Sequence, residues 1–438
     1  MKFLRLFFLL TLFNINIFAD IKPGTVIVDA RAEKLVNAIL TRLCKSSKIL
    51  LVPKIYFVVD KSVNAFATDQ SKIFIHTGLI IKFKNVKQLI AVLAHEMGHI
   101  TGGHAHRMKN EMHGLSVASV LGTLLGGAAA LASGNFEPLV AGSLLGQSAA
   151  MGTFAAFSRT HEKEADAAGF RLLQQAGLST EGFIETFELF KKMNSFGEIP
   201  YLQTHPSDQD RITAFIHYRD AHPDTGSIPE EWEQEFQIIQ AIFMASLLKP
   251  SESERFYYQK TTPAARIARA IVYARKGQYD NAFNKMEELI GESPDNPYLH
   301  EMYGQFLLES GNAHKALQHL RRAIQLASDA LSIRLLYAQA LYTASSDNAQ
   351  EAIDHLNRIT QDDPDNVAAW LLKVGAYRKL NQHGLADLAQ AEAAMRMGDT
   401  RLAHSRAQRA KKSDNPKIRE QAKMLLEDSR MRGVDDDE

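Results

Sequence analysis

The sequence predicts a mostly α-helical protein in which an α+β domain precedes a domain of helical repeats. Two β-rich segments, residues 50–59 and 72–76, lie in the first fifth of the chain, and an apolar run with helical spacing follows Asn85. From about residue 260 a turn motif recurs after 34 residues, which is typical of paired-helix repeats. The 438 residues suggest two to four domains. The 45% apolar and 23% charged content excludes a mostly disordered chain, a collagen-like fibre and a polytopic membrane protein.

Charge and cysteine content exclude further classes of protein. Lys and Arg number 50 and Asp and Glu number 50, so the formal net charge is zero. A general nucleic-acid binder is usually strongly basic, and we therefore expect no nucleic-acid partner. The single cysteine, Cys44, excludes an intramolecular disulfide and a cysteine-rich zinc finger. Any zinc site in this chain must consist of histidines and carboxylates.

The N-terminus has the pattern of a targeting segment. Lys2 and Arg5 precede a mostly apolar run over residues 6–18, which is short for a bilayer span, and the small residue Ala19 follows. This pattern is typical of a secretory signal peptide, here residues 1–19, cleaved near Ala19. It predicts an exported protein, and an uncleaved N-terminal anchor is the alternative.

Residues 114–157 differ in composition from the rest of the chain. Residues 114–133 contain no charged side chain, and glycine and alanine dominate the stretch. The length would fit a transmembrane helix. However, the many Gly and Ser residues and the lack of a close basic flank on the C-terminal side favour a buried or membrane-surface helical hairpin. We therefore expect at most contact with a membrane surface here.

The C-terminal part repeats a turn motif. The sequence Gly-x-x-x-x-Ala at residues 277–282 recurs at residues 311–316 and again at residues 398–403. A 34-residue period with small residues where paired helices touch predicts tetratricopeptide repeats, with an ordinary helical bundle as the alternative. The fourth repeat lacks the regular spacing, and residues 367–383 are predicted to form an extra helix. The predicted domains are residues 20–250, the repeats over residues 251–432 and an acidic tail over residues 433–438.

The chemistry is concentrated in a helical H-E-x-x-H motif. His95 and His99 are four residues apart, so on a helix both imidazoles point from one face and can bind one Zn²⁺. Glu96 lies beside the open coordination position that a catalytic zinc keeps. A third protein ligand must come from elsewhere in the chain.

That third ligand is expected from a second helical segment, Ser-Arg-x-His-Glu-x-Glu-Ala-Asp, which begins at Ser158. Glu162 and Asp166 share a helix face, so Glu162 could reach the zinc while Asp166 orients a ligating histidine. His161 competes as a ligand but lies off that face, and Glu164 is expected to be exposed to solvent.

Two further histidines follow the motif. On a continuing helix His104 would lie about 180° from His95, and His106 would lie ~10 Å along the axis from His99. We therefore expect both to be structural or surface residues and neither to be a ligand.

These motifs resemble a known family of enzymes. HEMGH and SRxxExEAD, preceded by Asn64-Ala65-Phe66-Ala67 and by GLI at residues 78–80, are similar to the HtpX/CAAX-prenyl-protease type of zinc metallopeptidases. The signal peptide, the THPxxxDRI element at residues 204–212 and the repeats extend the resemblance over essentially the whole mature chain. It implies a periplasmic zinc metalloendopeptidase that acts on unfolded or stalled outer-membrane proteins and their assembly machinery, with chaperone-like activity.

The resemblance also implies roles for particular residues. It implies one Zn²⁺ per chain bound by His95, His99 and Glu162, with Glu96 as the general base. His205 would correspond to a histidine that approaches the zinc and holds the enzyme latent, and His205 and Arg211 are both candidates for stabilising the oxyanion. The substrate would pair with an edge strand formed by Asn64, Ala65, Phe66 and Ala67, and residues 114–157 would supply helices near the site.

Alternatives to this function remain open. The chain could be mainly a chaperone or adaptor with a closed zinc site. A CAAX protease fits less well because it needs several membrane spans. Residues 401–432 hold ten Lys and Arg against four Asp and Glu, which indicates either a partner-binding face or a solvated helix surface.

Overall fold

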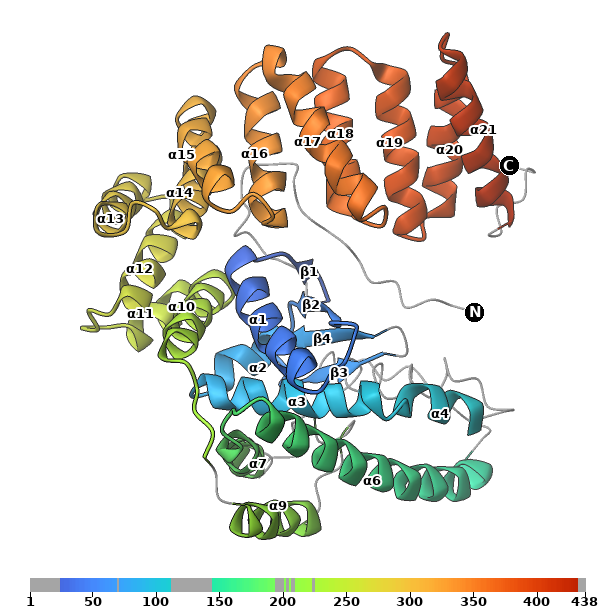
Figure 1. Ribbon diagram of the computed structural model, residues 1–438. Helices are drawn as coiled ribbons and strands as arrows, with labels where there is room; N and C mark the ends of the chain where they lie inside the picture. Colours follow the sequence, from blue (N-terminus) through green and yellow to red (C-terminus); the bar gives the residue numbers. More distant parts are fainter. Residues whose placement is uncertain are drawn as a thin grey trace. The chain divides into compact units, whose positions relative to one another are not determined.

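The computed structural model describes residues 24–68, 71–111, 144–193, 201, 205, 209–222 and 225–431 (Figure 1). The predicted signal peptide, most of the charge-free segment and the acidic tail lie outside these residues. The described chain forms two compact units. The first is Ala32–Phe243, and the second begins at Met244, inside α10 (Glu230–Leu247), and also includes the N-terminal residues up to Arg31. Among the described residues, no helix is both long and apolar enough to cross a membrane.

Strands β2, β3 and β4 of the first unit form a small mixed sheet together with β1, in the order β1-β2-β4-β3. Strand β2 (Lys54–Val58) pairs in parallel with β4 (Lys72–His76), and β4 pairs antiparallel with β3 (Ala65–Ala67); β1 is Val26–Ile27. Alternate side chains of β2 and β4 are buried on one face, as expected for a sheet with one covered face. The strand order leaves β3 at the edge, immediately after Asn64.

Helices of the first unit pack around α3 (Val86–Thr101), the helix that carries the H-E-x-x-H motif. Its N-terminus is capped by the side chain of Asn85, which accepts a hydrogen bond from the backbone N–H of Gln88 at 3.2 Å. Gly98 lets α3 approach α6 closely, because a Cβ at this position would lie 2.4 Å from the carbonyl oxygen of Ala165. The remaining helices are α1 (Ala30–Ser46), α2 (Thr77–Lys82), α4 (His104–Glu111), α6 (Leu144–Gln175), α7 (Glu181–Met193) and α9 (Gln209–Ala221).

The second unit is a row of antiparallel helices, with α17 to α20 side by side in Figure 1. Its helices are α11 (Pro250–Phe256), α12 (Pro263–Arg275), α13 (Tyr279–Glu292), α14 (Pro297–Glu309), α15 (Ala313–Leu326), α16 (Leu331–Ala344), α17 (Ala349–Asp362), α18 (Val367–Lys379), α19 (His383–Arg396), α20 (Thr400–Ala410) and α21 (Pro416–Met431). The alanines of the repeated motif, Ala282, Ala316 and Ala403, are at most 2% exposed, so they form the close helix contacts that the period predicts.

The turns between paired helices use left-handed backbone conformations. Gly277, Gly311 and Gly398 have φ values of 73°, 83° and 74°, which glycine adopts without steric cost. At the corresponding turn between α18 and α19 the chain has Asn381, with φ of 56°. Asparagine is one of the few other residues that tolerate this conformation. The expectation of an extra helix at residues 367–383 is therefore wrong, because α18 is the first helix of a regular pair whose turn glycine is replaced by asparagine.

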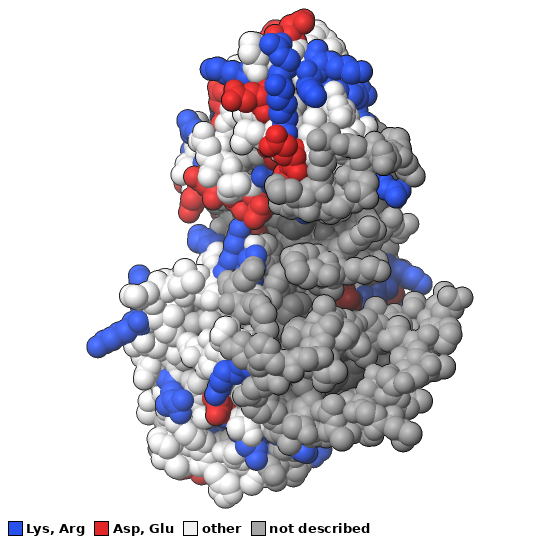
Figure 2. All heavy atoms as spheres, turned by 90° about the vertical axis from the view of Figure 1, so that its right-hand side faces the viewer, with Lys and Arg blue, Asp and Glu red and all other residues white. Residues whose placement is uncertain are grey.

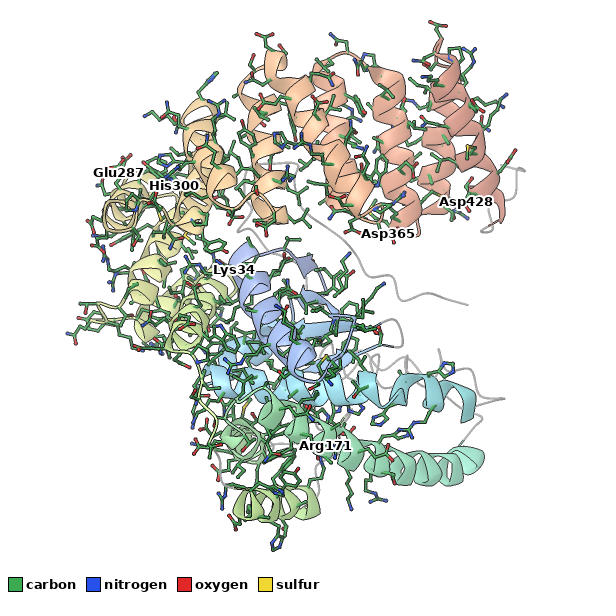
Figure 3. The ribbon with its side chains drawn as sticks, in the orientation of Figure 1. Lys34, Arg171, Glu287, His300, Asp365 and Asp428 are labelled. Atoms are coloured by element: carbon green, nitrogen blue, oxygen red, sulfur yellow. The ribbon has the colours of Figure 1, made fainter. Side chains whose placement is uncertain are left out.

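Polar side chains cross between neighbouring repeat helices. Tyr303 of α14 donates a hydrogen bond to Glu287 of α13 at 2.8 Å, and Figure 3 labels Glu287 on the outer side of this pair. At the C-terminal end, Lys and Arg side chains gather with Asp and Glu among them (Figure 2). Asp387 of α19 contacts both Arg406 and Arg409 at 3.2 Å, so two of the ten basic residues share one carboxylate within the unit. The two units together give an α+β domain followed by helical repeats, which confirms the predicted fold class.

One buried acid makes the stability of the repeat unit depend on pH. Glu309 is 6% exposed and accepts a hydrogen bond from Gln305 at 3.0 Å. Burial raises the pKa of its carboxyl to about 7, and the bond from Gln305 offsets this only in part. The folded-state pKa lies above the unfolded value near ~4.3. The folded chain therefore binds more protons between these two pKa values, and stability falls as the pH rises through about 7.

We expect the free energy of unfolding of Glu309→Gln, relative to that of the parent, to be about 2 kcal/mol greater at pH 8 than at pH 5. Thermal unfolding of both proteins at the two pH values measures this difference. The exposed Glu420→Gln serves as the matched control and should show no such pH dependence. An equal effect of Glu309→Gln on stability at both pH values would contradict a raised pKa of Glu309 in the folded chain.

Candidate metal centre

Four side chains from three parts of the first unit converge on one point. His95 and His99 come from α3 and Glu162 from α6, while His205 lies between α7 and α9. His95 Nε2 lies 3.0 Å from His99 Nε2 and 3.2 Å from His205 Nδ1. Glu162 Oε1 lies 3.3 Å from His99 Nε2 and 3.1 Å from His205 Nδ1. One ligand atom from each residue falls within 4.8 Å of all the others, and among the described residues this is the only such group.

Asp166 and Arg211 fix the orientation of this cluster. Asp166, one turn after Glu162 on α6, contacts His95 Nδ1 through Oδ1 at 2.8 Å. Arg211, near the start of α9, donates to Asp166 from Nε at 2.6 Å and from Nη2 at 2.7 Å, and its Nη1 lies 3.0 Å from Glu162 Oε2. The bidentate geometry holds the carboxylate in one orientation, so His95 has its Nε2 free to face the cluster.

The electrostatics of the cluster favour positive charge at its centre. Burial raises the pKa of Glu162, but the imidazoles of His205, His95 and His99 outweigh it and hold the pKa well below its ordinary value. Burial lowers the pKa of His95, but the carboxylates of Asp166 and Glu162 raise it to about 10. Burial lowers the pKa of His99 to about 3. The site therefore combines ionised carboxylates with imidazole nitrogens, which is the donor chemistry that Zn²⁺ prefers when thiolates are lacking.

Glu96 is a buried carboxylate beside the cluster. It is 0% exposed, and neither oxygen has a well-formed hydrogen bond within the described residues. Its Oε1 lies 3.5 Å from His205 Nε2, which also has no hydrogen-bond partner there. Burial raises the pKa of Glu96, and the nearby backbone of Ala67 on β3 lowers it only in part. A buried carboxylate with unused hydrogen-bonding capacity needs a partner, and a metal with a water molecule beside it fits this position.

His104 lies in a different place from the one that the sequence predicts. The expectation of a position about 180° from His95 assumed a continuing helix, and it is wrong because α3 ends at Thr101 and Gly103 has φ of 64°. The helix is interrupted at the two glycines, and His104 Nδ1 lies 2.8 Å from His99 Nδ1. The glycine pair before His104 was the sequence signal that could have revealed this turn.

The neighbours of His104 also differ from expectation. Glu164 keeps about half its side chain exposed, as predicted, but it also contacts His104 Nε2 at 3.1 Å and Arg107 Nη2 at 2.6 Å. His161 is buried and stacks on His104 with ring centroids 4.5 Å apart, outside the group of ligand atoms. His106 is exposed.

Two parts of the chain match known protein families. Residues 30–219 match peptidase family M48, and residues 275–359 match a family described as anaphase-promoting complex, cyclosome, subunit 3. Most of the first unit is therefore similar to peptidases of family M48, and helical repeats of the tetratricopeptide type follow it. This confirms the resemblance to zinc metallopeptidases inferred from the motifs.

Among individual proteins, the chain is similar to the beta-barrel assembly-enhancing protease of Escherichia coli K12. The two are 24% identical over 86% of this chain and 75% of the relative. A Vibrio cholerae protein named for the same activity is 27% identical, and the match covers 62% of this chain and 58% of that protein. The chain thus matches somewhat more than half of the length of the Vibrio relative.

Other matches cover less than half of this chain. The metalloprotease LoiP of Escherichia coli is 32% identical over 38% of this chain and 61% of the relative. The solved structure of YrrB, a tetratricopeptide-repeat protein, matches with a TM-score of 0.32 and 20% identity over 43% of this chain and 95% of that chain.

Proposed function

We propose that this protein is an exported zinc metalloendopeptidase of the periplasm that acts in the quality control and assembly of outer-membrane β-barrel proteins. The convergence of His95, His99 and Glu162 carries the proposal of an enzyme, together with the adjacent Glu96, whose oxygens make no well-formed hydrogen bond within the described residues. The names of the Escherichia coli and Vibrio cholerae relatives support the class of substrate. The repeats supply a surface suited to binding partner chains, and chaperone-like activity would follow from that binding.

The donor atoms of His95, His99 and Glu162 would hold one zinc ion. The ion supplies a Lewis acid that polarises the scissile carbonyl and acidifies a water molecule. Glu96 accepts the proton of the attacking water and delivers it to the leaving amine. Asp166 and Arg211 keep His95 in the orientation and tautomer that ligation requires, as outer-shell groups commonly do. Arg211, with two carboxylates already in contact, is better placed for this role than for stabilising an oxyanion.

The edge strand offers a binding mode for an extended substrate. β3 and the preceding Asn64 lie at the open side of the sheet, and the backbone of Ala67 is near the carboxylate of Glu96. A peptide that adds a strand along Asn64, Ala65, Phe66 and Ala67 would gain backbone hydrogen bonds. It would also bring a peptide carbonyl to the metal centre.

His205 supports a latent state of the enzyme. Its Nδ1 lies among the ligand atoms, so it would occupy the fourth position that a catalytic zinc leaves open for water. Tyr201 stacks on its ring with centroids 4.5 Å apart. This geometry favours the latency role over an oxyanion role, because a ring that ligates the metal blocks the site at which the carbonyl would bind.

We expect His205→Ala to raise kcat/KM for an unfolded protein substrate several-fold, because the open position becomes accessible. Initial rates of casein cleavage at fixed zinc occupancy measure this change. His217→Ala, at an exposed histidine of α9, is the matched control. A fall in activity for His205→Ala, with His217→Ala unchanged, would instead favour a role of His205 in stabilising the oxyanion.

The proposed function is tested by metal removal and replacement with the purified full chain. Casein and a denatured outer-membrane β-barrel protein serve as substrates. A strong chelator is expected to abolish cleavage of both, and one equivalent of Zn²⁺ per chain should restore it. Cleavage that survives complete metal removal would contradict the proposal.

Because His205 supplies a fourth donor beside His95, His99 and Glu162, the site could be closed to substrate. This supports a second function, that of a chaperone or adaptor with a closed zinc site. This function predicts that zinc-loaded protein suppresses aggregation of an unfolded β-barrel protein and cleaves neither substrate. Suppression without cleavage in both the parent and His205→Ala would favour this second function.

A further inference from the structure

A break between α3 and α4 brings a further histidine, His104, against the metal centre. The backbone N–H of Gly102 still bonds to the carbonyl of Gly98 at 2.9 Å, and Gly103 then adopts φ of 64°. This left-handed conformation suits glycine. After it, the ring of His104 lies edge-on against that of His99, with ring centroids 4.9 Å apart. A Cβ at position 102 would lie 2.3 Å from His104 Nε2, so Gly102 leaves the room that the ring occupies.

The ring of His104 is held on three sides. It is buried, at 4% exposure, with Nδ1 2.8 Å from His99 Nδ1 and Nε2 3.1 Å from Glu164 Oε2. Arg107 donates to the same oxygen of Glu164 at 2.6 Å. The ring of His161 stacks on it almost in parallel, at 9°. Side chains of α4 and α6 meet between these two helices in Figure 3.

These contacts fix the direction of the hydrogen bonds. A neutral histidine that ligates a metal through Nε2 carries its proton on Nδ1. His99 therefore donates from Nδ1 to the unprotonated Nδ1 of His104. His104 then carries its own proton on Nε2 and donates it to Glu164. This series of hydrogen bonds requires one particular tautomer of His99 and one of His104.

We propose that His104, oriented by Glu164 and Arg107, is a positioning residue that holds His99 in the rotamer and tautomer needed to bind the metal through Nε2. The proposal rests on the proposed function, since it concerns metal binding at His99. It gives both motif histidines equivalent support: Asp166 with Arg211 orients His95 directly, and Glu164 with Arg107 orients His99 through His104. The two carboxylates lie two residues apart on α6, so this one helix directs both ligands.

The zinc dissociation constant of the full chain, measured by chelator competition, tests this role without any assay of activity. His104→Leu removes the acceptor for His99 and is expected to weaken zinc binding by ~10–100-fold, as is typical for outer-shell partners. His104→Asn places an amide oxygen near the position of Nδ1 and is expected to restore most of the affinity. The absorption spectrum of the Co²⁺-substituted protein should change for His104→Leu and stay close to the parent spectrum for His104→Asn.

Glu164→Gln provides a second variant at a half-exposed side chain, which the fold tolerates. It is expected to weaken zinc binding by about fivefold, less than His104→Leu. In the double variant the two effects should not add, because Glu164 acts only through His104. The exposed Glu188→Gln on α7 is the matched control and should bind zinc as the parent does.

The outcomes separate this proposal from the proposed function. If the parent binds zinc and a folded His104→Leu binds it equally well with an unchanged cobalt spectrum, the positioning role is overturned and the peptidase proposal stands. Additive effects of His104→Leu and Glu164→Gln would also overturn it. If the parent itself binds no zinc, the proposed function fails and the positioning role fails with it.

Discussion

Replacing Glu96 by glutamine is expected to lower the rate of casein cleavage by ~10²–10⁴-fold, the usual contribution of a general base. Glutamine has almost the same shape as glutamate but cannot accept a proton from the attacking water. Glu96 is fully buried, and its oxygens make no well-formed hydrogen bond within the described residues. The substitution therefore removes the base without removing a well-formed hydrogen bond of the described residues.

Zinc content separates a catalytic loss from a structural one. Glu96 lies outside the group of ligand atoms, so the glutamine variant should retain the zinc content of the parent. Glu188→Gln, an exposed carboxylate on α7, should lose neither property. Parent-like cleavage by Glu96→Gln would show that another group is the base.

Arg211→Met is expected to lower the free energy of unfolding of the first unit by about 3–5 kcal/mol, the usual cost of breaking a buried ion pair by removing one partner. Arg211 is 1% exposed at its side chain and contacts both Asp166 and Glu162. Burial opposes its charge, but the carboxylate of Asp166 raises the pKa of the guanidinium, which stays ionised. Methionine fills similar volume but leaves both carboxylates without their counter-charge.

Denaturant unfolding monitored by fluorescence measures this effect in the right unit. The chain has two tryptophans, of which Trp232 lies in the first unit and Trp370 among the repeats. The comparison is therefore made in a Trp370→Phe background. Arg219→Met, which breaks an exposed pair with Asp220 on the same helix, should change stability by less than ~1 kcal/mol. Equal effects of the two substitutions would contradict the role given to the buried pair.

Local periodicity was enough to predict much of the candidate site. The four-residue spacing of His95 and His99 and of Glu162 and Asp166 places each pair on one helix face, and the structure brings the two faces together. The pairing of these two helices could not come from periodicity. It depends on Gly98, which allows the backbone of α3 to meet that of α6.

The position of His104 could not be read from helical spacing because the helix does not continue. Two adjacent glycines follow α3 within four residues of His99, and the left-handed conformation of Gly103 breaks the helical register before α4 begins. Spacing rules apply only inside a continuous helix. The same limit applies to Asn381, where a non-glycine residue forms a repeat turn and concealed the regular pairing of α18 with α19.

The placement of His205 and Arg211 required tertiary structure. They follow the last residue of α6, Gln175, by 30 and 36 residues, and only the resemblance to a family linked His205 to the metal. In the structure both contact Glu162, His205 at 3.1 Å and Arg211 at 3.0 Å. Long-range packing of this kind leaves no periodic trace in the sequence.

The zinc content of the purified full chain tests the central claim most directly, when measured by mass spectrometry of the metal after dialysis. The parent is expected to hold one zinc per chain, while His99→Ala and Glu162→Ala hold far less under the same conditions. His217→Ala, at an exposed histidine, should match the parent. A parent without zinc, or undiminished zinc in both ligand variants, would contradict the assignment of this metal centre.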